Sequence, residues 1–135
     1  MTLRCQHNYE AAEALQKQAL TGLKEVLGAD HQDTINSMQS LSVALWYRCK
    51  YSEGQEVILE VLEKRRVLGE EHPDFLIGIG ILAAMFQAQG QFDEAERLFR
   101  VELKGLEKVL GKEHPETRRS FGNLTEARKE KQSSH

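Results

Sequence analysis

Cysteine and proline are both scarce in this chain, and the scarcity of cysteine excludes a class of protein. The 135 residues include 2 Cys and 2 Pro. Two cysteines do not make the disulfide framework that stabilises small secreted domains. The N-terminus also lacks the pattern of a secretion signal. We therefore expect Cys5 and Cys49 to be free thiols and the chain to be cytoplasmic.

The chain also has no large excess of positive or negative charge. The chain has 18 Lys and Arg against 21 Asp and Glu, a net charge of −3. A nucleic-acid groove needs concentrated Lys and Arg to displace counterions. The longest basic cluster, residues 64–66, lies within a helical pattern, where a solvated helix face is the better interpretation. We expect no nucleic-acid partner.

The chain also lacks an apolar run long enough for a membrane. Its most apolar stretch, residues 75–86, has twelve residues without a charge, whereas a membrane span takes about 20. We therefore expect no membrane role. Apolar residues make up 40% of the chain, enough to fill the core of one domain.

A box of Leu-Gly, two residues and a histidine occurs three times, at residues 27–31, 68–72 and 110–114. Its glycines lie 41 and then 42 residues apart. Each glycine ends one helical pattern, because glycine readily takes the left-handed conformation that follows a last helical turn. The histidine comes just before the next pattern. The chain is therefore predicted to be an array of a repeated helix pair.

Apolar residues at steps of three and four define the helices. The predicted spans are 9–27, 33–49, 51–68, 74–89, 92–110 and 115–131. Asp33 is the expected N-cap of the second span. The Ile-Gly alternation over 77–81 resembles a strand period, but it lies inside the repeat frame and is interpreted as helix. The fold class is all-α, an antiparallel helix-pair solenoid of about six helices.

The repeat frame also predicts the domain organisation. We expect one domain over 1–132, with units near 1–28, 29–69 and 70–111, a polar capping helix over 115–131 and a frayed tail at 133–135. Leu3 holds the place that Leu45 holds in the next copy. The chain is thus expected to begin inside a first helix, with residues 1–8 as the only cover for the helix from Tyr9.

The three box histidines invite a metal-site hypothesis, which their spacing disfavours. Zinc ligands lie about 2 Å from one centre, whereas these histidines are a whole repeat apart, separated by packed helices about 8–10 Å across. A structural role in each loop is the preferred interpretation. No Ser-His-Asp or Cys-His arrangement has a turn suited to a nucleophile, and no phosphate loop follows a strand. We therefore expect the protein to have no enzymatic activity and to bind no metal or cofactor.

Four segments carry a family resemblance: residues 89–90 (Gln-Gly), 94–96 (Glu-Ala-Glu), 109–111 (Val-Leu-Gly) and 114–117 (His-Pro-Glu-Thr). They resemble tetratricopeptide repeats of the 42-residue kind found in kinesin light chains, most closely the arrays at the C-terminal end of fungal signalling ATPases. The resemblance extends over about residues 3–127. It implies a right-handed superhelix that binds other proteins.

The resemblance also implies a binding groove, because the first helix of each pair lines the concave side in this family. The residues at groove positions that we consider candidates for partner binding are Asn36, Gln39, Val43, Trp46, Tyr47, Gln87 and Asn123. Adjacent aromatic residues such as Trp46 and Tyr47 supply a large contact area at low entropy cost. The alternative for Trp46 is packing on a neighbouring helix. Members of the family often carry a pair of groove asparagines in each first helix. The second asparagine of the pair corresponds here to Ser40, Ile81 and Asn123, so only the third copy retains it.

Two functions remain as hypotheses. The first is a non-catalytic module that binds a peptide or helix of a partner protein in its groove. The second is a structural segment that self-associates through exposed terminal helices, for example as a homodimer. The helix over 74–89 is apolar nearly all round, which fits either core packing or an association face.

Overall fold

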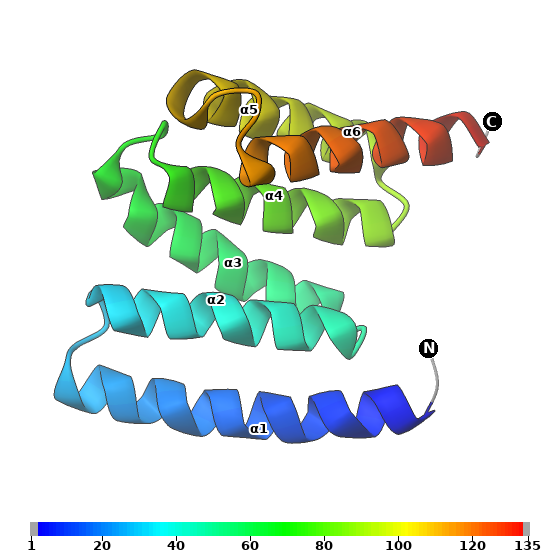
Figure 1. Cartoon of the computed structure of the whole chain (residues 1–135). Coiled ribbons are helices and arrows are strands. Elements are labelled where there is room, and N and C mark those ends of the chain that lie inside the picture. The colour runs from blue at the N-terminus through cyan, green and yellow to red at the C-terminus, as the bar shows by residue number, and fades with distance from the viewer. Residues whose placement is uncertain (1–2, 134–135) are drawn as a thin grey trace. The chain divides into compact units, whose positions relative to one another are not determined.

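A computed structural model describes residues 3–133, apart from the side chains of residues 3–9 and of Leu68. Over this range the chain forms six α-helices and one 3-10 turn, without strands (Figure 1). The elements are α1 (Leu3–Val26), α2 (Gln32–Tyr47), α3 (Tyr51–Arg65), η1 (Arg66–Leu68), α4 (Pro73–Ala88), α5 (Phe92–Leu110) and α6 (Pro115–Ser133). The prediction of an all-α helical repeat fold is confirmed.

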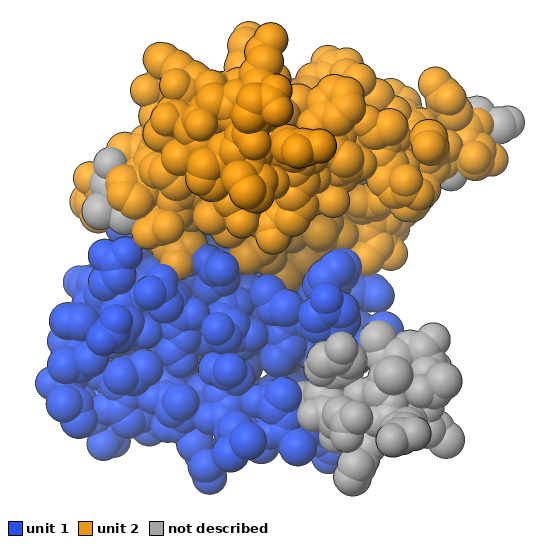
Figure 2. All heavy atoms as spheres, viewed as in Figure 1, with its two compact units in different colours: residues 1–64 blue, residues 65–135 orange. Residues whose placement is uncertain are grey.

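The chain divides into two compact units, residues 1–64 and residues 65–135 (Figure 2). In the first unit, α2 packs along α1. The buried face of α2 carries Ile35, Met38, Leu41 and Leu45. Their steps of three and four place these side chains along one stripe of the helix.

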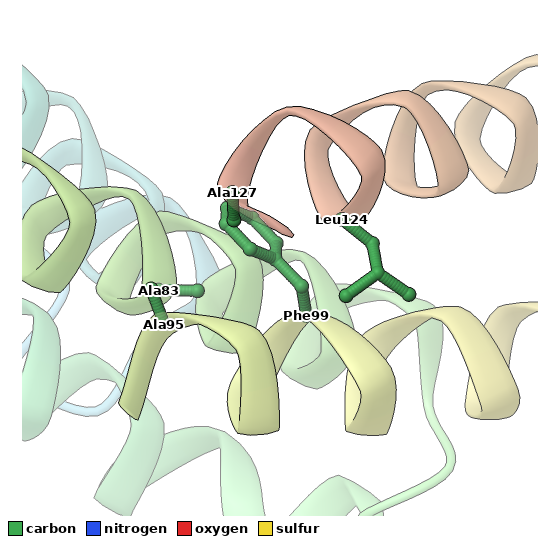
Figure 3. Close-up of a cluster of buried hydrophobic side chains, with 5 residues drawn as sticks. All are labelled: Ala83, Ala95, Phe99, Leu124 and Ala127. Carbon is green, nitrogen blue, oxygen red and sulfur yellow. The ribbon is translucent and has the colours of Figure 1, made fainter. Parts of the chain in front are cut away.

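In the second unit, α5 packs against both α4 and α6. The Phe99 ring extends from α5 toward Ala127 of α6 in a buried cluster, to which α4 contributes Ala83 (Figure 3). The cluster consists of Ala83, Ala95, Phe99, Leu124 and Ala127. No residue of α4 from Phe75 to Gln87 is exposed. Core packing therefore accounts for the apolar character of this helix.

The three boxes act as helix boundaries, as expected. Gly28, Gly69 and Gly111 all have positive φ, between 87° and 104°. The box histidine then begins the next helix, because its Nδ1 accepts a hydrogen bond from the amide two residues further on. These bonds are Asp33 N to His31 (3.0 Å), Asp74 N to His72 (3.1 Å) and Glu116 N to His114 (3.2 Å).

The prediction of Asp33 as the N-cap is therefore wrong. His31 is the cap of α2, with extended backbone angles, and Asp33 lies in the first turn. A histidine was overlooked because caps are sought among residues with side-chain oxygens. An imidazole nitrogen that lacks a proton can accept the same bond.

Two helix boundaries differ from the predicted ones. Residues 3–8 continue α1 and do not form a separate first helix, and no glycine or proline interrupts the chain from Leu3 to Thr21. At the other end, α6 includes Ser133, so the helix extends into the predicted frayed tail. Residues 134–135 of that tail lie outside the described residues.

Candidate functional site

Five of the seven candidate residues share one face of α2. Their spacing of three, four, three and one residues places them on a stripe separate from the buried stripe of Ile35 to Leu45. Asn36 and Tyr47 are exposed on this face. The other three, Gln39, Val43 and Trp46, are half-buried.

Trp46 and Tyr47 form an aromatic pair at the C-terminal end of α2. Their ring centroids lie 4.9 Å apart, with the planes tilted by 39°, within the range of favourable aromatic contacts. Trp46 is half-buried and Tyr47 is exposed. Trp46 therefore contributes to packing and still presents part of its surface beside Tyr47. We refer to Asn36, Gln39, Val43, Trp46 and Tyr47 as the α2 face.

An ion cluster holds the end of α2 that carries the aromatic pair. Glu13 of α1 is buried, and its carboxylate accepts hydrogen bonds from Arg48 and from Lys50 Nζ at 3.4 Å. Lys17 Nζ lies 2.8 Å from the same carboxylate. Burial opposes the ionisation of Glu13, but the hydrogen bonds from Lys17 and Arg48 outweigh it and lower its pKa to about 2. The cluster therefore fixes the chain that follows Trp46 and Tyr47.

The second unit repeats this cluster around Glu96 of α5. Glu96 lies 2.8 Å from Arg100, 3.2 Å from Arg128 and 3.4 Å from Lys131. Burial opposes its ionisation, and the hydrogen bonds from Arg128 and Lys131 lower its pKa nonetheless. Glu13 and Glu96 both stand four residues after the aromatic residue of their copy. This recurrence was the sequence signal for the cluster, and our sequence analysis missed it.

The two remaining candidates, Gln87 and Asn123, belong to the second unit. Gln87 of α4 donates a hydrogen bond of 2.7 Å from Nε2 to Glu130 of α6. Its amide is thus engaged within the chain and links two first helices. Asn123 is exposed on α6.

A buried carboxyl group at the meeting of α4, α5 and α6 was also missed. Glu102 of α5 is 3% exposed and accepts a hydrogen bond of 2.9 Å from Ser120 Oγ of α6. A Cβ at Gly80 of α4 would lie 2.2 Å from Glu102 Oε2, so a larger residue there would require the Glu102 carboxyl group to move. Burial raises the pKa of Glu102 to about 7, and Ser120 and Arg119 partly oppose the rise. Glu102 stands where the two earlier copies of the repeat have Ala19 and Val61. This change from an apolar to an acidic residue was the signal in the sequence.

Within residues 3–133, no group of three or more His, Cys, Asp or Glu side chains could hold a metal ion. Among the described helices, none combines the length and apolarity that crossing a membrane requires. The Cys49 thiol is free and exposed, and the Cys5 side chain lies outside the described residues.

The helix pairs, their boxes and the repeated ion clusters define an all-α helical repeat protein. The sequence pattern of the tetratricopeptide repeat (TPR) matches residues 1–66 and residues 80–116. The chain belongs to the TPR family, and its repeats are of the kinesin-light-chain-like kind. No curated protein matches the sequence significantly.

Two solved structures show the same fold. One is a Podospora anserina protein named for kinesin light chain and for its nearly identical TPR-like repeats, with a TM-score of 0.82 and 28% identity over 94% of this chain. A substituted form of that protein gives a TM-score of 0.80 and 28% identity over 92% of this chain. The chain spans about three fifths of their length, 62% and 60% respectively.

Proposed function

We propose that the chain is a non-catalytic interaction module that binds a peptide or helix of a partner protein through the α2 face. TPR proteins generally mediate contacts between proteins. The observation that carries the proposal is the aromatic pair of Trp46 and Tyr47, which is accessible at the end of a helix face that also carries polar Asn36 and Gln39. Binding hot spots are enriched in Trp and Tyr, so this end of α2 supplies the anchor. A cytoplasmic location is part of the proposal, in keeping with the exposed thiol of Cys49.

Substitution of Tyr47, the exposed member of the aromatic pair, tests this proposal. Partners captured from the source cell with the wild-type chain are identified, purified and titrated against three proteins: wild type, Tyr47→Ala and Val101→Ala. Val101 is exposed on α5 and serves as the matched control. We expect Tyr47→Ala to weaken partner binding about tenfold or more with unchanged circular dichroism, and Val101→Ala to bind as wild type. Equal affinities of all three proteins for the partner would rule out the α2 face as the partner-binding surface.

The second candidate function is self-association through the terminal helices. Its support is the exposure of large apolar side chains there: Leu15 and Val26 of α1 are 66% and 80% exposed, and Phe121 of α6 is 58% exposed. Exposed apolar surface of this kind favours association. Sedimentation velocity at rising protein concentration tests it. A wild-type chain that remains a 15.4 kDa monomer throughout would reject this function.

A further inference from the structure

The contact of α5 with α6, the α5–α6 contact, contains less apolar surface than the contact of α5 with α4. The buried residues of α6 are two with hydroxyl groups, one leucine and one alanine: Thr117, Ser120, Leu124 and Ala127. Those of α4 include four large apolar residues: Phe75, Leu76, Leu82 and Met85. Burial stabilises packing roughly in proportion to the apolar area removed from water. Apolar packing therefore holds α6 less firmly than α4.

A carboxyl group lies inside the α5–α6 contact. Glu102 of α5 is 3% exposed, and it accepts its hydrogen bond from Ser120 Oγ of α6, a residue that is 1% exposed. On the side of α4, the carboxyl group fills the space that a Cβ at Gly80 would need. Glu102 is therefore enclosed by all three helices of the second unit.

The charges around Glu102 do little to favour its ionised form. Residues 75–87 of α4 include no titratable side chain. From α6, Arg119 and Glu116 act on Glu102 in opposite directions, and their side chains also form an ion pair with each other. An ionised Glu102 would thus be buried without a dedicated positive partner, which is costly.

The first unit has a similar set of residues without the carboxyl group. The residues of α2 that stand at the places of the four buried residues of α6 are Thr34, Ser37, Leu41 and Ala44. Ala19 of α1 stands at the place of Glu102. Ser37 Oγ is buried and has no hydrogen-bond partner within the described chain. Glu102 therefore distinguishes the second unit, where it gives the matching serine a partner.

Protonation decides whether Glu102 is stable in this place. A neutral carboxyl group loses far less on burial than a carboxylate, whose hydration is strong. Burial raises the pKa of Glu102 to about 7, so the proton is lost close to neutral pH. The ionised group then favours any opening that returns it to water. Separation of α6 does so at the smaller loss of apolar packing.

We propose that the α5–α6 contact is a pH-sensitive switch, closed while Glu102 is protonated and open in part of the molecules once Glu102 is ionised. Opening moves α6 away from α5 and leaves α4 packed on α5. It also breaks the hydrogen bond from Gln87 of α4 to Glu130 of α6. The switch goes beyond the proposed binding function, because it operates in the chain without a partner.

Hydrogen exchange of the full chain at pH 6 and pH 8, measured by NMR, tests the switch. Each rate is first corrected for the intrinsic effect of pH on exchange. We expect the amides of residues 120–127 in α6 to be less protected than those of α4 at both pH values. Their protection should fall about tenfold from pH 6 to pH 8, as expected when the pKa of Glu102 is about 7 in the closed state and 4.5 in the open state. The amides of Leu41 and Ala44 in α2 should keep their protection.

Two substitutions and a control connect this change to Glu102. Glu102→Gln has no proton to lose, so the protection of α6 should be the same at both pH values. Ser120→Ala removes the hydrogen bond that lowers the pKa of Glu102, so the titration of the Glu102 carboxyl carbon should move to higher pH. Glu126→Gln, at an exposed acid of α6, is the matched control and should retain the tenfold change of the wild type.

Three results would overturn the switch. The first is a Glu102 carboxyl group that titrates at its ordinary value of 4.5. The second is a protection of α6 that does not change between pH 6 and pH 8, or that changes equally in Glu102→Gln. The third is exchange in α6 that is no faster than in α4, since the whole unit would then open together. None of them bears on the effect of Tyr47→Ala, so the proposed binding function would stand.

Discussion

Cys49 takes a backbone conformation that is ordinarily left to glycine, with a φ of 63°. It follows the C-cap of α2, where the Lys50 amide donates a hydrogen bond of 2.9 Å to Leu45 O. Gly90 takes the same position after α4, with a φ of 81°, and Gln91 N donates to Phe86 O at 2.9 Å. A Cβ in this region of φ costs about 1–2 kcal/mol. The backbone at Cys49, in the turn after α2, is therefore strained, whereas the backbone at Gly90, in the turn after α4, is not.

Cys49→Gly should relieve that strain. We expect the free energy of unfolding to rise by about 0.5–1 kcal/mol, because the entropy of glycine in the unfolded chain offsets part of the gain. The measurement is urea denaturation at pH 7 under reducing conditions. Gly90→Cys is the matched control and should lower the free energy of unfolding. A less stable Cys49→Gly protein would show that the thiol contributes packing that outweighs the backbone term.

Glu102 makes stability fall as pH rises. Its pKa is about 7 in the fold, above the ordinary value of 4.5, so the folded state holds the proton more tightly between these pH values. The favourable contribution of the protonated group is complete below pH 4.5 and is lost as pH rises through about 7. Glu102→Gln keeps a neutral group near Ser120 and should remove this loss. We expect it to exceed wild-type stability at pH 8 by up to about 3 kcal/mol, and to match it at pH 4.

Urea denaturation at pH 4, 6 and 8 measures this difference. Glu60→Gln, at an exposed site on α3, is the control and should shift stability equally little at each pH. A Glu102→Gln protein that loses stability with rising pH as steeply as the wild type would refute the assignment of this dependence to Glu102.

At the scale of elements, each unit has one ion cluster that joins a second helix to the first helix that follows it. Glu13 links α1 to the end of α2, and Glu96 links α5 to α6. Both carboxylates are held ionised by basic groups from two helices. Removing a partner of the buried Glu13 carboxylate is costly, since it leaves charges without partners. The clusters therefore fix the registers in which α1 meets α2 and α5 meets α6.

Glu13→Gln should destabilise the protein at neutral pH. The pKa of Glu13 is lowered to about 2, so its contribution is present above about pH 4.5 and is lost as pH falls through about 2. We expect a loss of up to about 3 kcal/mol at pH 7, and a smaller difference from wild type at pH 3. Thermal or urea unfolding at both pH values gives these differences. Glu25→Gln, at an exposed site on α1 away from the cluster, should change little. An equal loss at pH 7 and pH 3 would contradict an ionic role.

At the scale of the whole molecule, the helices differ in how many neighbours cover them. Inside the second unit, α5 packs against both α4 and α6, whereas in the first unit α1 packs against α2. In repeat proteins, stability is approximately a sum over neighbouring interfaces. Hydrogen exchange on the full chain should therefore show the slowest amides in α5 around Phe99 and faster exchange in α1 near Leu15. Uniform protection of the two helices would contradict this gradient.

The sequence predicted the helices well because their ends depend on local chemistry. Gly28, Gly69 and Gly111 stop helices by their own backbone freedom, which needs no knowledge of the rest of the fold. The burial of Glu102 could not be predicted in this way, because three helices create it. The same holds for Trp46, whose half-buried state depends on what surrounds α2. Residues 3–8 were assigned to a separate helix because repeat register was given more weight than the absence of a helix stop.

The two buried carboxyl groups have a joint consequence for how the two units respond to acid. Glu13 lies in the unit of residues 1–64 and favours its charged form, while Glu102 lies in the unit of residues 65–135 and favours its neutral form. Mild acid, from pH 7 to pH 4.5, thus strengthens the second unit without yet weakening the first. Stronger acid then weakens the first unit through Glu13, and also the second unit through Glu96, whose pKa is lowered as well. The two units therefore differ in their response to mild acid and share a response to strong acid.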